Sequence, residues 1–288
     1  LRILRLYRFA ARFGFAIDPP TGQAARALCA HLDCVSVERI EEELSKLLAA
    51  PAPAAYLDEK ILKVIIPELS APALQAAKPV VDACPAGTED LPVRWAALLM
   101  SLGEDGTRKA LKRLRCSNAC IEQTVVLVRG MGGSGGRFLL GHEKGHSIAL
   151  PTACGSRVPP QRTVLGETST APGQAPAAPD TAIRIRKLLG RYDLHTVQRL
   201  AALGAAMEPE QAADFAAQAE LAAQLDADGV CCRVSQLAVN GRDLMAAGIP
   251  AGPGLRRTLE ALLDAVVRGQ LPNERQRLLD AVRENSAS

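Results

Sequence analysis

The sequence predicts an all-α protein assembled from many short helices. Apolar residues recur three, four and seven positions apart over most of the chain, and no strand-like alternation of apolar and polar residues persists. Aromatic residues make up 3% of a chain that is 48% hydrophobic, so leucine, alanine, valine and isoleucine must fill most of the core. A length of 288 residues allows more than one packed unit.

The first helix is predicted over residues 1–15. Leu6, Phe9 and Phe13 recur at the spacing of one helical face, and we expect this face to pack. The neighbouring stripe is basic and consists of Arg2, Arg5 and Arg8. Gly14 and the prolines that follow it are typical of a helix end. The chain opens inside this helical pattern with no capping residue before it, which we interpret as the start of a segment of a longer protein.

Helical periodicity continues through most of the remaining chain. Further helices are expected over residues 21–31, 36–50, 54–62, 93–102, 106–114, 121–128, 181–189, 195–206 and 209–226, with a last helical unit over 234–282. Ser36 is a favourable N-cap for the helix that starts there. Prolines are expected to break the stretch after residue 62 into short pieces, at Pro67, Pro72, Pro79, Pro85 and Pro92.

Residues 130–180 lose the helical pattern and are rich in glycine, proline, serine and threonine, so we predict a flexible linker or disordered insertion. Two short patterns inside it imitate known sites. Residues 142–146, HEKGH, have the spacing of a zinc-protease helix, but their glycine neighbours disfavour a helix and no third ligand is evident. Residues 130–136, GMGGSGG, could begin a dinucleotide-binding loop, but no βαβ pattern surrounds them. We therefore predict no metal site and no dinucleotide site.

Charge and cysteine content narrow the function classes. The 34 basic and 31 acidic residues give a net charge of +3, too small for the whole surface to attract a polyanion. Three basic clusters without an acid, at residues 2–12, 107–120 and 184–191, favour a phosphate-bearing partner over three solvated helix faces. The eight cysteines show no disulfide or zinc spacing, and no uncharged apolar run is long enough for a membrane helix. We expect a soluble, cytoplasmic protein without membrane contact.

The opening string LRILRLYRFAARFGF resembles a motif of class II CCA-adding tRNA nucleotidyltransferases and the related poly(A) polymerases. In that family Glu-Asp-x-x-Arg is followed by I-L-R-x-x-R-F. Arg2 matches the motif arginine, Arg5 and Arg8 match the next two, and the family's Glu and Asp would precede Leu1. The resemblance implies that Arg2 donates to the ring nitrogen that is an acceptor in both cytosine and adenine. It implies further that Arg5 and Arg8 bind the triphosphate of CTP or ATP.

Two further segments carry the same resemblance. SVERIEEELSKLL resembles the E-R-x-x-x-E motif of the family's neck domain, which implies that Glu38, Arg39 and Glu43 support the nucleotide pocket. Arg39 and Glu43 are spaced as an i, i+4 ion pair, and an ordinary charged helix face is the competing interpretation. LKRLRCSN resembles a helix junction of the body domain, and we expect tRNA contacts from Arg113 and Arg115.

The string NGRDLMAAGIPAGPGLRRTLEALL resembles the tail domain of Gram-positive-type CCA-adding enzymes. Gly252 and Gly254 permit a tight turn whose backbone amides can approach a phosphate of tRNA. Arg256 and Arg257 add positive charge on the first turn of the helix that follows. A purely structural corner between two helices is the alternative.

The resemblance implies a neck over residues 1–66, a body over 67–129, a linker or insertion over 130–180, and the rest of the body with a tail over 181–288, arranged as an elongated arm. It implies the tRNA-binding portion of an enzyme that adds CCA to tRNA 3′ ends from CTP and ATP. Mg²⁺ would be held by a catalytic head domain outside these residues, so no catalytic residue is expected here and the chain alone should be inactive. A poly(A) polymerase, a CC- or A-adding enzyme and a stand-alone RNA-binding module are the alternatives.

Overall fold

The computed structural model describes residues 1–131 and 179–286, and every regular element in these two ranges is a helix. The prediction of an all-α class is confirmed. The α-helices are α1 (Arg2–Phe13), α2 (Pro19–Ala27), α3 (Val37–Leu48), α4 (Glu59–Ile65), α5 (Ala71–Ala83), α6 (Leu91–Leu99), α7 (Gly103–Arg113), α8 (Asn118–Met131), α9 (Pro179–Arg191), α10 (Leu194–Met207), α11 (Ala212–Ala227), α12 (Gly241–Ala246), α13 (Pro253–Val267) and α14 (Arg275–Ser286). The HEKGH pattern and most of the glycine-rich pattern lie outside the described residues.

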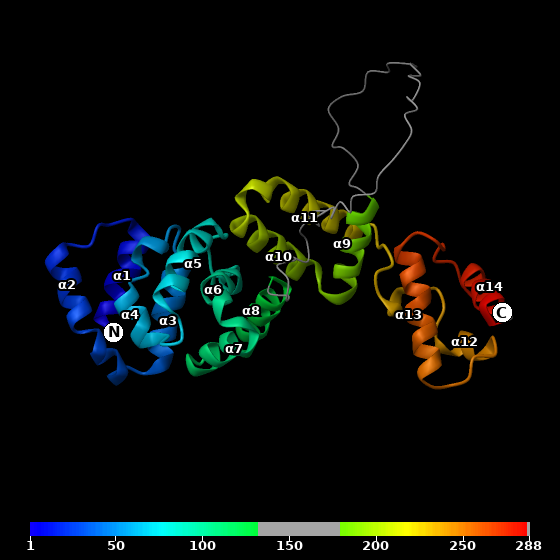
Figure 1. Cartoon of the computed structure of the whole chain (residues 1–288), viewed down its shortest axis with the longest axis horizontal. Helices are drawn as coiled ribbons and strands as arrows, with labels where there is room; N and C mark the ends of the chain where they lie inside the picture. Colours follow the sequence, from blue (N-terminus) through cyan, green and yellow to red (C-terminus); the bar gives the residue numbers. More distant parts are fainter. Residues whose placement is uncertain (132–178, 287–288) are drawn as a thin grey trace, which may run out of the picture.

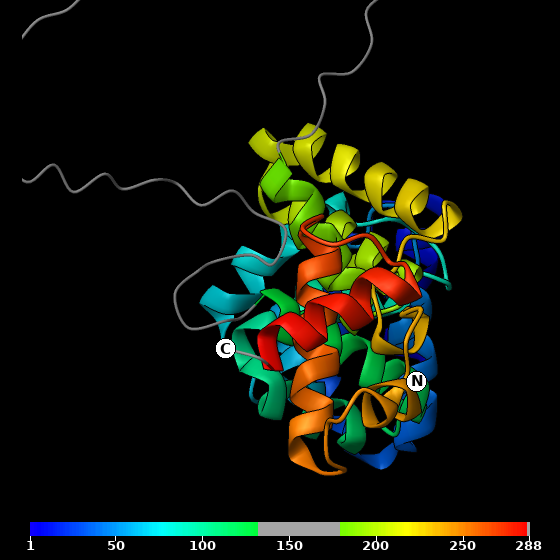
Figure 2. The same ribbon diagram turned by 90° about the vertical axis from the view of Figure 1, so that its right-hand side faces the viewer.

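The helices follow one another along an elongated arm, with α1 and α2 at one end and α12 to α14 at the other (Figure 1). Helix α1 packs on α3, α6 packs on α5 and α8, and α10 packs on α11. Viewed from the tail end, α13 and α14 cross in front of the other helices (Figure 2). The two ends of the described chain therefore lie far apart along the arm.

Local sequence explains where most helices begin and end. Gly14 ends α1 in the left-handed conformation, with φ 69°, as the sequence predicts. Asp58 and Asp193 cap α4 and α10 by accepting hydrogen bonds from backbone amides of the first turn. Ser36 occupies the predicted N-cap position of α3, although its side chain accepts no capping hydrogen bond.

Helix α5 contradicts the prediction that Pro79 separates two helical pieces, because this proline lies inside the helix. Pro79 is on the exposed side of α5, where water can reach the Gln75 carbonyl that lacks its usual partner. Leu74 and Val81 are buried on the opposite side of the same helix. Burial of this apolar side outweighs the loss of one helical hydrogen bond.

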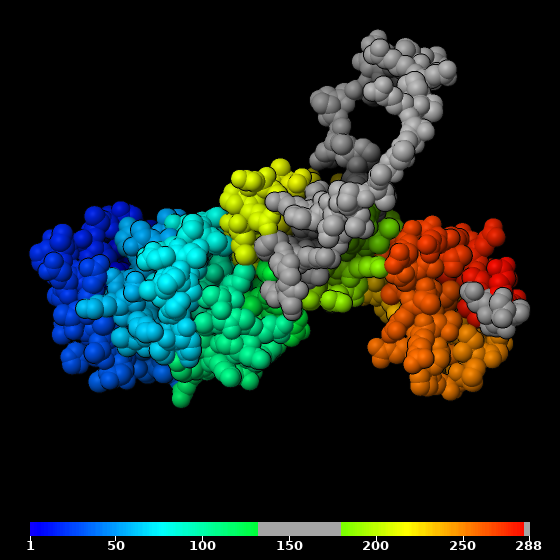
Figure 3. Space-filling view, in the orientation of Figure 1, coloured from blue at the N-terminus to red at the C-terminus, as the bar shows by residue number. Residues whose placement is uncertain are grey.

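The buried apolar residues form two separate cores. The larger runs without a break from Leu4 in α1 to Cys232 after α11. The smaller belongs to α12, α13 and α14 and is built from Val239, Leu244, Leu262, Leu278, Leu279 and Val282. These last helices form a lobe of their own (Figure 3). Two polar contacts join the lobe to α9: Arg186 Nη1 donates to the Val267 carbonyl at 3.0 Å, and Lys187 lies 2.8 Å from Asp264.

Arg94 lies at the centre of the larger core, where its side chain joins three segments. It is 1% exposed, and its guanidinium donates to the carbonyl oxygens of Leu48 and Ala50 after α3 and, at 2.9 Å, of Cys84 after α5. Burial lowers the pKa of Arg94 and raises the pKa of the Cys84 thiol to about 12. The end of α3 is thereby anchored to α6, which carries Arg94.

Candidate nucleotide and RNA interface

Helix α1 presents its basic residues from a firmly packed position. Leu4, Tyr7 and Ala11 are buried on the inner side of α1, together with Ala10. Of the predicted stripe of Leu6, Phe9 and Phe13, Leu6 is partly buried and packs against the core. Both sets have the same helical spacing, so periodicity alone could not decide between them. The prediction that Phe9 and Phe13 pack is wrong: they are 43% and 56% exposed.

Two members of the arginine row (Arg2, Arg5 and Arg8) are held from below by Glu43 of α3, namely Arg5 and Arg8. The Glu43 side chain is 4% exposed, and its two oxygens face different arginines. Arg5 Nε donates a hydrogen bond to Oε1 at 3.2 Å. Arg8 Nε lies 3.2 Å from Oε2 in an ion pair without hydrogen-bond geometry. Arg2 and Arg5 reach solvent, whereas the Arg8 side chain is only 16% exposed.

The partner predicted for Glu43 was a different arginine. Sequence spacing suggested Arg39, but Arg39 is exposed on α3 while the Glu43 carboxylate lies beneath α1. A buried carboxylate is stabilised best by cations that share its low-dielectric surroundings, and Arg8 supplies one. The interaction predicted between Arg39 and Glu43 is therefore wrong, although Glu43 does contact two of the predicted nucleotide-facing arginines.

The basic cluster at residues 107–120 contains no acidic residue, but in the folded chain its arginines contact glutamates from other segments. Arg113 pairs with Glu68 at 2.8 Å and donates to the Ile65 carbonyl at 3.1 Å. Arg115 pairs with Glu38, whose pKa is lowered first by a hydrogen bond from its own backbone amide and then by Arg115. Such exposed pairs contribute little to stability and can exchange for phosphate contacts. Contact of Arg113 and Arg115 with tRNA stays a prediction.

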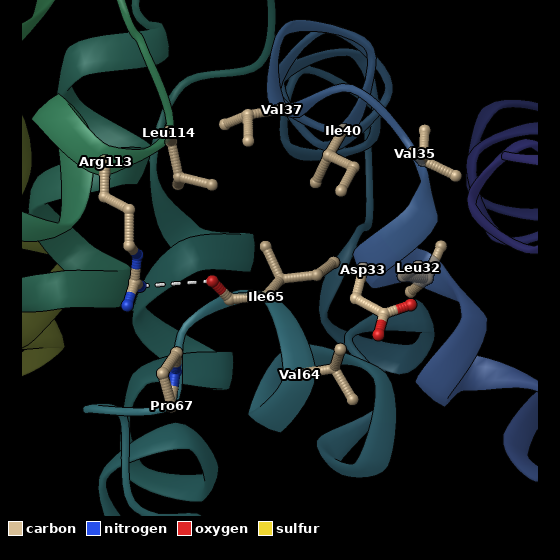
Figure 4. A pocket seen from close by; sticks show the side chains of 10 residues that line it. All are labelled: Leu32, Asp33, Val35, Val37, Ile40, Val64, Ile65, Pro67, Arg113 and Leu114. Carbon is tan, nitrogen blue, oxygen red and sulfur yellow. Dashed lines mark hydrogen bonds between the residues drawn. The ribbon is translucent and has the colours of Figure 1, made fainter.

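Arg113 also forms one wall of a hollow of about 200 Å³ between residues 32–40, residues 64–67 and the end of α7 (Figure 4). Its lining is mostly apolar and consists of Leu32, Asp33, Val35, Val37, Ile40, Val64, Ile65, Pro67, Arg113 and Leu114. Pockets that enclose a small-molecule ligand are usually larger, at roughly 300–1,000 Å³. The hollow contains none of the arginine row, so it is not the candidate nucleotide site.

In the tail lobe, Gly252 precedes α13 with φ 148°, a conformation that residues with side chains rarely adopt. A Cβ added at Gly254 would meet no atom within 4 Å, so the start of α13 is open to a ligand. Arg256 pairs with Glu260, which raises the pKa of the arginine, and Arg257 is exposed beside it. The four predicted tRNA-binding residues of the tail therefore lie together on the surface.

Among residues 1–131 and 179–286, no group of three or more histidine, cysteine, aspartate or glutamate side chains is arranged to hold a metal ion. The side chains described here do not fit a magnesium centre, and we derive no metal-dependent step from them. None of the helices in these ranges has the length and apolar character needed to cross a bilayer.

Comparison with known proteins shows which proteins the chain resembles. Residues 191–282 match the family model "tRNA nucleotidyltransferase domain 2", and residues 14–71 match "Probable RNA and SrmB- binding site of polymerase A". The CCA-adding enzyme of Limosilactobacillus fermentum is 29% identical over 298 aligned residues that cover 99% of this chain. Along nearly its whole length the chain is similar to CCA-adding enzymes.

Further CCA-adding enzymes show the same similarity. The CCA-adding enzyme of Geobacillus stearothermophilus is 26% identical over 96% of the chain, and that of Bordetella bronchiseptica is 38% identical over 44%. The solved structure of the Bacillus stearothermophilus CCA-adding enzyme in complex with CTP shares the fold, with a TM-score of 0.63 at 22% identity over 99% of this chain. The chain spans 59% and 58% of the first two relatives and matches their C-terminal part.

Sequence reasoning missed two features of this chain. The first is Arg94, although a single arginine in the apolar string LPVRWAALL is a recognisable sign of a buried, fully bonded cation. The second is the exposure of the phenylalanines of α1. No signal in the sequence distinguishes an exposed apolar stripe from a packed one when both have helical spacing.

Proposed function

We propose that this chain is the RNA-binding part of a cytoplasmic tRNA nucleotidyltransferase that adds CCA to tRNA 3′ ends from CTP and ATP. The observation that carries the proposal is the arginine row on α1, aligned by the buried Glu43, in a chain that matches CCA-adding enzymes along 99% of its length. Guanidinium groups on a rigid helix present planar sets of donors that match the acceptor atoms of bases and phosphates.

The arginines divide by exposure. Arg2 is assigned the base contact, because it is exposed and can donate to the ring nitrogen acceptor of cytosine and adenine. Arg5 is assigned a contact with the triphosphate, since its side chain is 55% exposed despite its bond to Glu43. Arg8 is assigned to the triphosphate as well, but its guanidinium would have to leave Glu43 to reach it.

The body and tail are assigned the RNA itself. Arg113 and Arg115 near the middle of the arm, and Gly252, Gly254, Arg256 and Arg257 in the tail lobe, would contact backbone phosphates of tRNA. Phosphate contacts of this kind position an RNA by its shape and charge without reading its sequence. The Mg²⁺ ions and the catalytic carboxylates are assigned to the part of the family's proteins that lies outside the match. We therefore expect this chain by itself to transfer no nucleotide.

A bacterial poly(A) polymerase is the second candidate, favoured by the match of residues 14–71 to a model described for polymerase A. The two candidates differ in the RNA they recognise. A CCA-adding enzyme should prefer the folded arm of tRNA, whereas a poly(A) polymerase should accept an unstructured 3′ end. A stand-alone RNA-binding module would bind RNA without any link to CTP or ATP.

Competition binding distinguishes these candidates. Fluorescently labelled tRNA without its CCA end is bound to the chain and displaced by unlabelled tRNA, by oligoadenylate or by a hairpin RNA of similar charge. We expect tRNA to be the strongest competitor. The logarithm of its binding constant should fall linearly with the logarithm of the salt concentration. Stronger competition by oligoadenylate would favour the poly(A) polymerase, and failure to bind any RNA would exclude both. Incorporation of CMP or AMP by the purified chain would contradict the assignment of catalysis to another part.

A further inference from the structure

Three exposed phenylalanines, here called the aromatic face, lie on the outer side of α1 and just beyond its end. Phe9 and Phe13 belong to α1, and Phe15 follows its C-cap, Gly14. They are 43%, 56% and 63% exposed. They account for three of the five phenylalanines in the chain. A contiguous exposed apolar surface of this kind marks a binding site far more often than three isolated exposures do.

The three rings form a continuous row. Phe9 and Phe13 have ring centroids 6.1 Å apart with planes 9° from parallel, and Phe13 and Phe15 have centroids 5.5 Å apart with planes 27° from parallel. Offset, nearly parallel packing at these distances is the favourable arrangement for aromatic rings. It presents a pre-ordered π surface that a further flat ring can join without reorganising the helix.

Guanidinium groups border this row. The Arg8 Cζ lies 4.2 Å from the centroid of Phe9, and the Arg12 Cζ lies 5.7 Å from the centroid of Phe13. At 100° per residue, Arg2 and Arg5 lie on the same outer side of α1 as Phe9 and Phe13. No acidic residue occurs between residues 1 and 17. The aromatic face is therefore apolar in its centre and positive around it.

We propose that the aromatic face is a stacking platform for unpaired nucleotides of the bound RNA, next to the arginine row. This inference rests on the proposed RNA-binding function and adds a site to it. Every base offers a π face, so stacking tolerates any sequence, and neighbouring arginines attract the phosphates between the bases. A duplex keeps its base faces covered, which restricts the platform to single-stranded segments. A partner protein would gain from the apolar area but would not need the arginines around it.

The test uses a short single-stranded RNA that contains one 2-aminopurine, whose fluorescence reports stacking, with anisotropy as the binding readout. Three double variants are compared: Phe9→Ala with Phe13→Ala, Phe9→Leu with Phe13→Leu, and Phe9→Tyr with Phe13→Tyr. The alanine and leucine pairs should weaken binding about tenfold or more and abolish the fluorescence change, because both lack the π surface. The tyrosine pair should bind within about twofold of the unchanged chain, since it keeps the rings.

The control is Leu28→Ala on α2, which removes an apolar side chain that is 51% exposed, more than Phe9, outside the aromatic face. It should leave binding of the single-stranded RNA unchanged. Circular dichroism checks folding, which the variants should retain because the replaced rings lie outside the core.

The other outcomes overturn the platform in distinguishable ways. Leucine variants that bind like the unchanged chain mean that apolar area, not ring stacking, matters. Self-association of the unchanged chain in sedimentation, lost in the alanine pair, means that the face joins two copies. The unchanged chain could bind tRNA while single-stranded RNA binds weakly, or binds equally to all variants. In that case only the stacking platform is contradicted. If the unchanged chain binds no RNA, the proposed function fails with it.

Discussion

The Nε atom of Arg8 lies 3.2 Å from the Oε2 atom of Glu43, and both side chains are largely withdrawn from solvent. The other carboxylate oxygen of Glu43 accepts a hydrogen bond from Arg5. One buried carboxylate thus orients two arginines that lie three residues apart on α1. Loss of that charge has consequences for stability that can be measured without any substrate.

Glu43→Gln should lower the free energy of unfolding by about 1–3 kcal/mol, because Arg8 is left buried without a countercharge. Urea denaturation followed by circular dichroism gives this value. The matched control is Glu42→Gln on the same helix, whose exposed i, i+4 pair with Lys46 should contribute little to stability. Equal losses from the two variants would show that Glu43 is not specially placed.

Arg94→Met should cost about 3 kcal/mol, because the carbonyl oxygens of Leu48, Ala50 and Cys84 lose their donor inside the core. Arg94→Lys should recover only part of the loss, since an ammonium cannot span carbonyls that a planar guanidinium reaches together. Thermal and urea unfolding report both variants. Arg39→Met, on the surface of α3, is the control and should stay within about 0.5 kcal/mol of the unchanged chain. A stability loss for Arg94→Met as small as the control's would contradict the anchoring role.

Gly204→Ala should destabilise the packing of α10 against α11 by about 1–3 kcal/mol, although alanine favours helices. A Cβ at Gly204 would lie 2.5 Å from a ring carbon of Phe215, whose side chain is 1% exposed and has no room to move. Combining it with Phe215→Leu should restore part of what the single change loses. Gly254→Ala, where a Cβ meets nothing within 4 Å, should change stability by less than about 1 kcal/mol in either direction.

Arg257→Ala should weaken tRNA binding severalfold and reduce the slope of log affinity against log salt by about one, as expected for one lost phosphate contact. Arg113→Ala should have a smaller effect, because Glu68 already holds the Arg113 guanidinium. Filter binding at several salt concentrations measures both. Arg283→Ala, a cation of the same lobe outside the predicted site, is the control. If the salt slope for Arg257→Ala equals that of the control, the tail turn does not contact phosphate.

Local sequence predicted a helix correctly wherever its signals, such as apolar periodicity and a terminating glycine, did not compete with tertiary packing. Helical periodicity and the glycine at position 14 located α1 correctly, and the family motif drew attention to the arginines on it. The prediction at Pro79 considered only the backbone N–H that proline lacks. Burial of the opposite side of α5 outweighs that loss, and it depends on neighbouring helices that local sequence does not reveal.

The candidate site was less predictable because its details depend on contacts between segments far apart in sequence. The i, i+4 rule favoured Arg39 as the partner of Glu43, whereas the tertiary fold places Arg5 and Arg8 above it. The same limitation explains why the acid-free run around Arg113 and Arg115 pairs with Glu68, between α4 and α5, and with Glu38 of α3. Charge patterns along a chain describe its sequence neighbours only.

Helix α3 is a rigid spacer between two anchored points. Near its middle it carries Glu43 beneath the arginines, and at its end the Leu48 carbonyl is bound by Arg94 of α6. The two attachment points are separated by roughly 7.5 Å of helix axis, a distance that side-chain motion cannot alter. The distance between the surface of α1 and that of α6 is therefore fixed by the protein. An RNA that contacts both surfaces would have to match this distance.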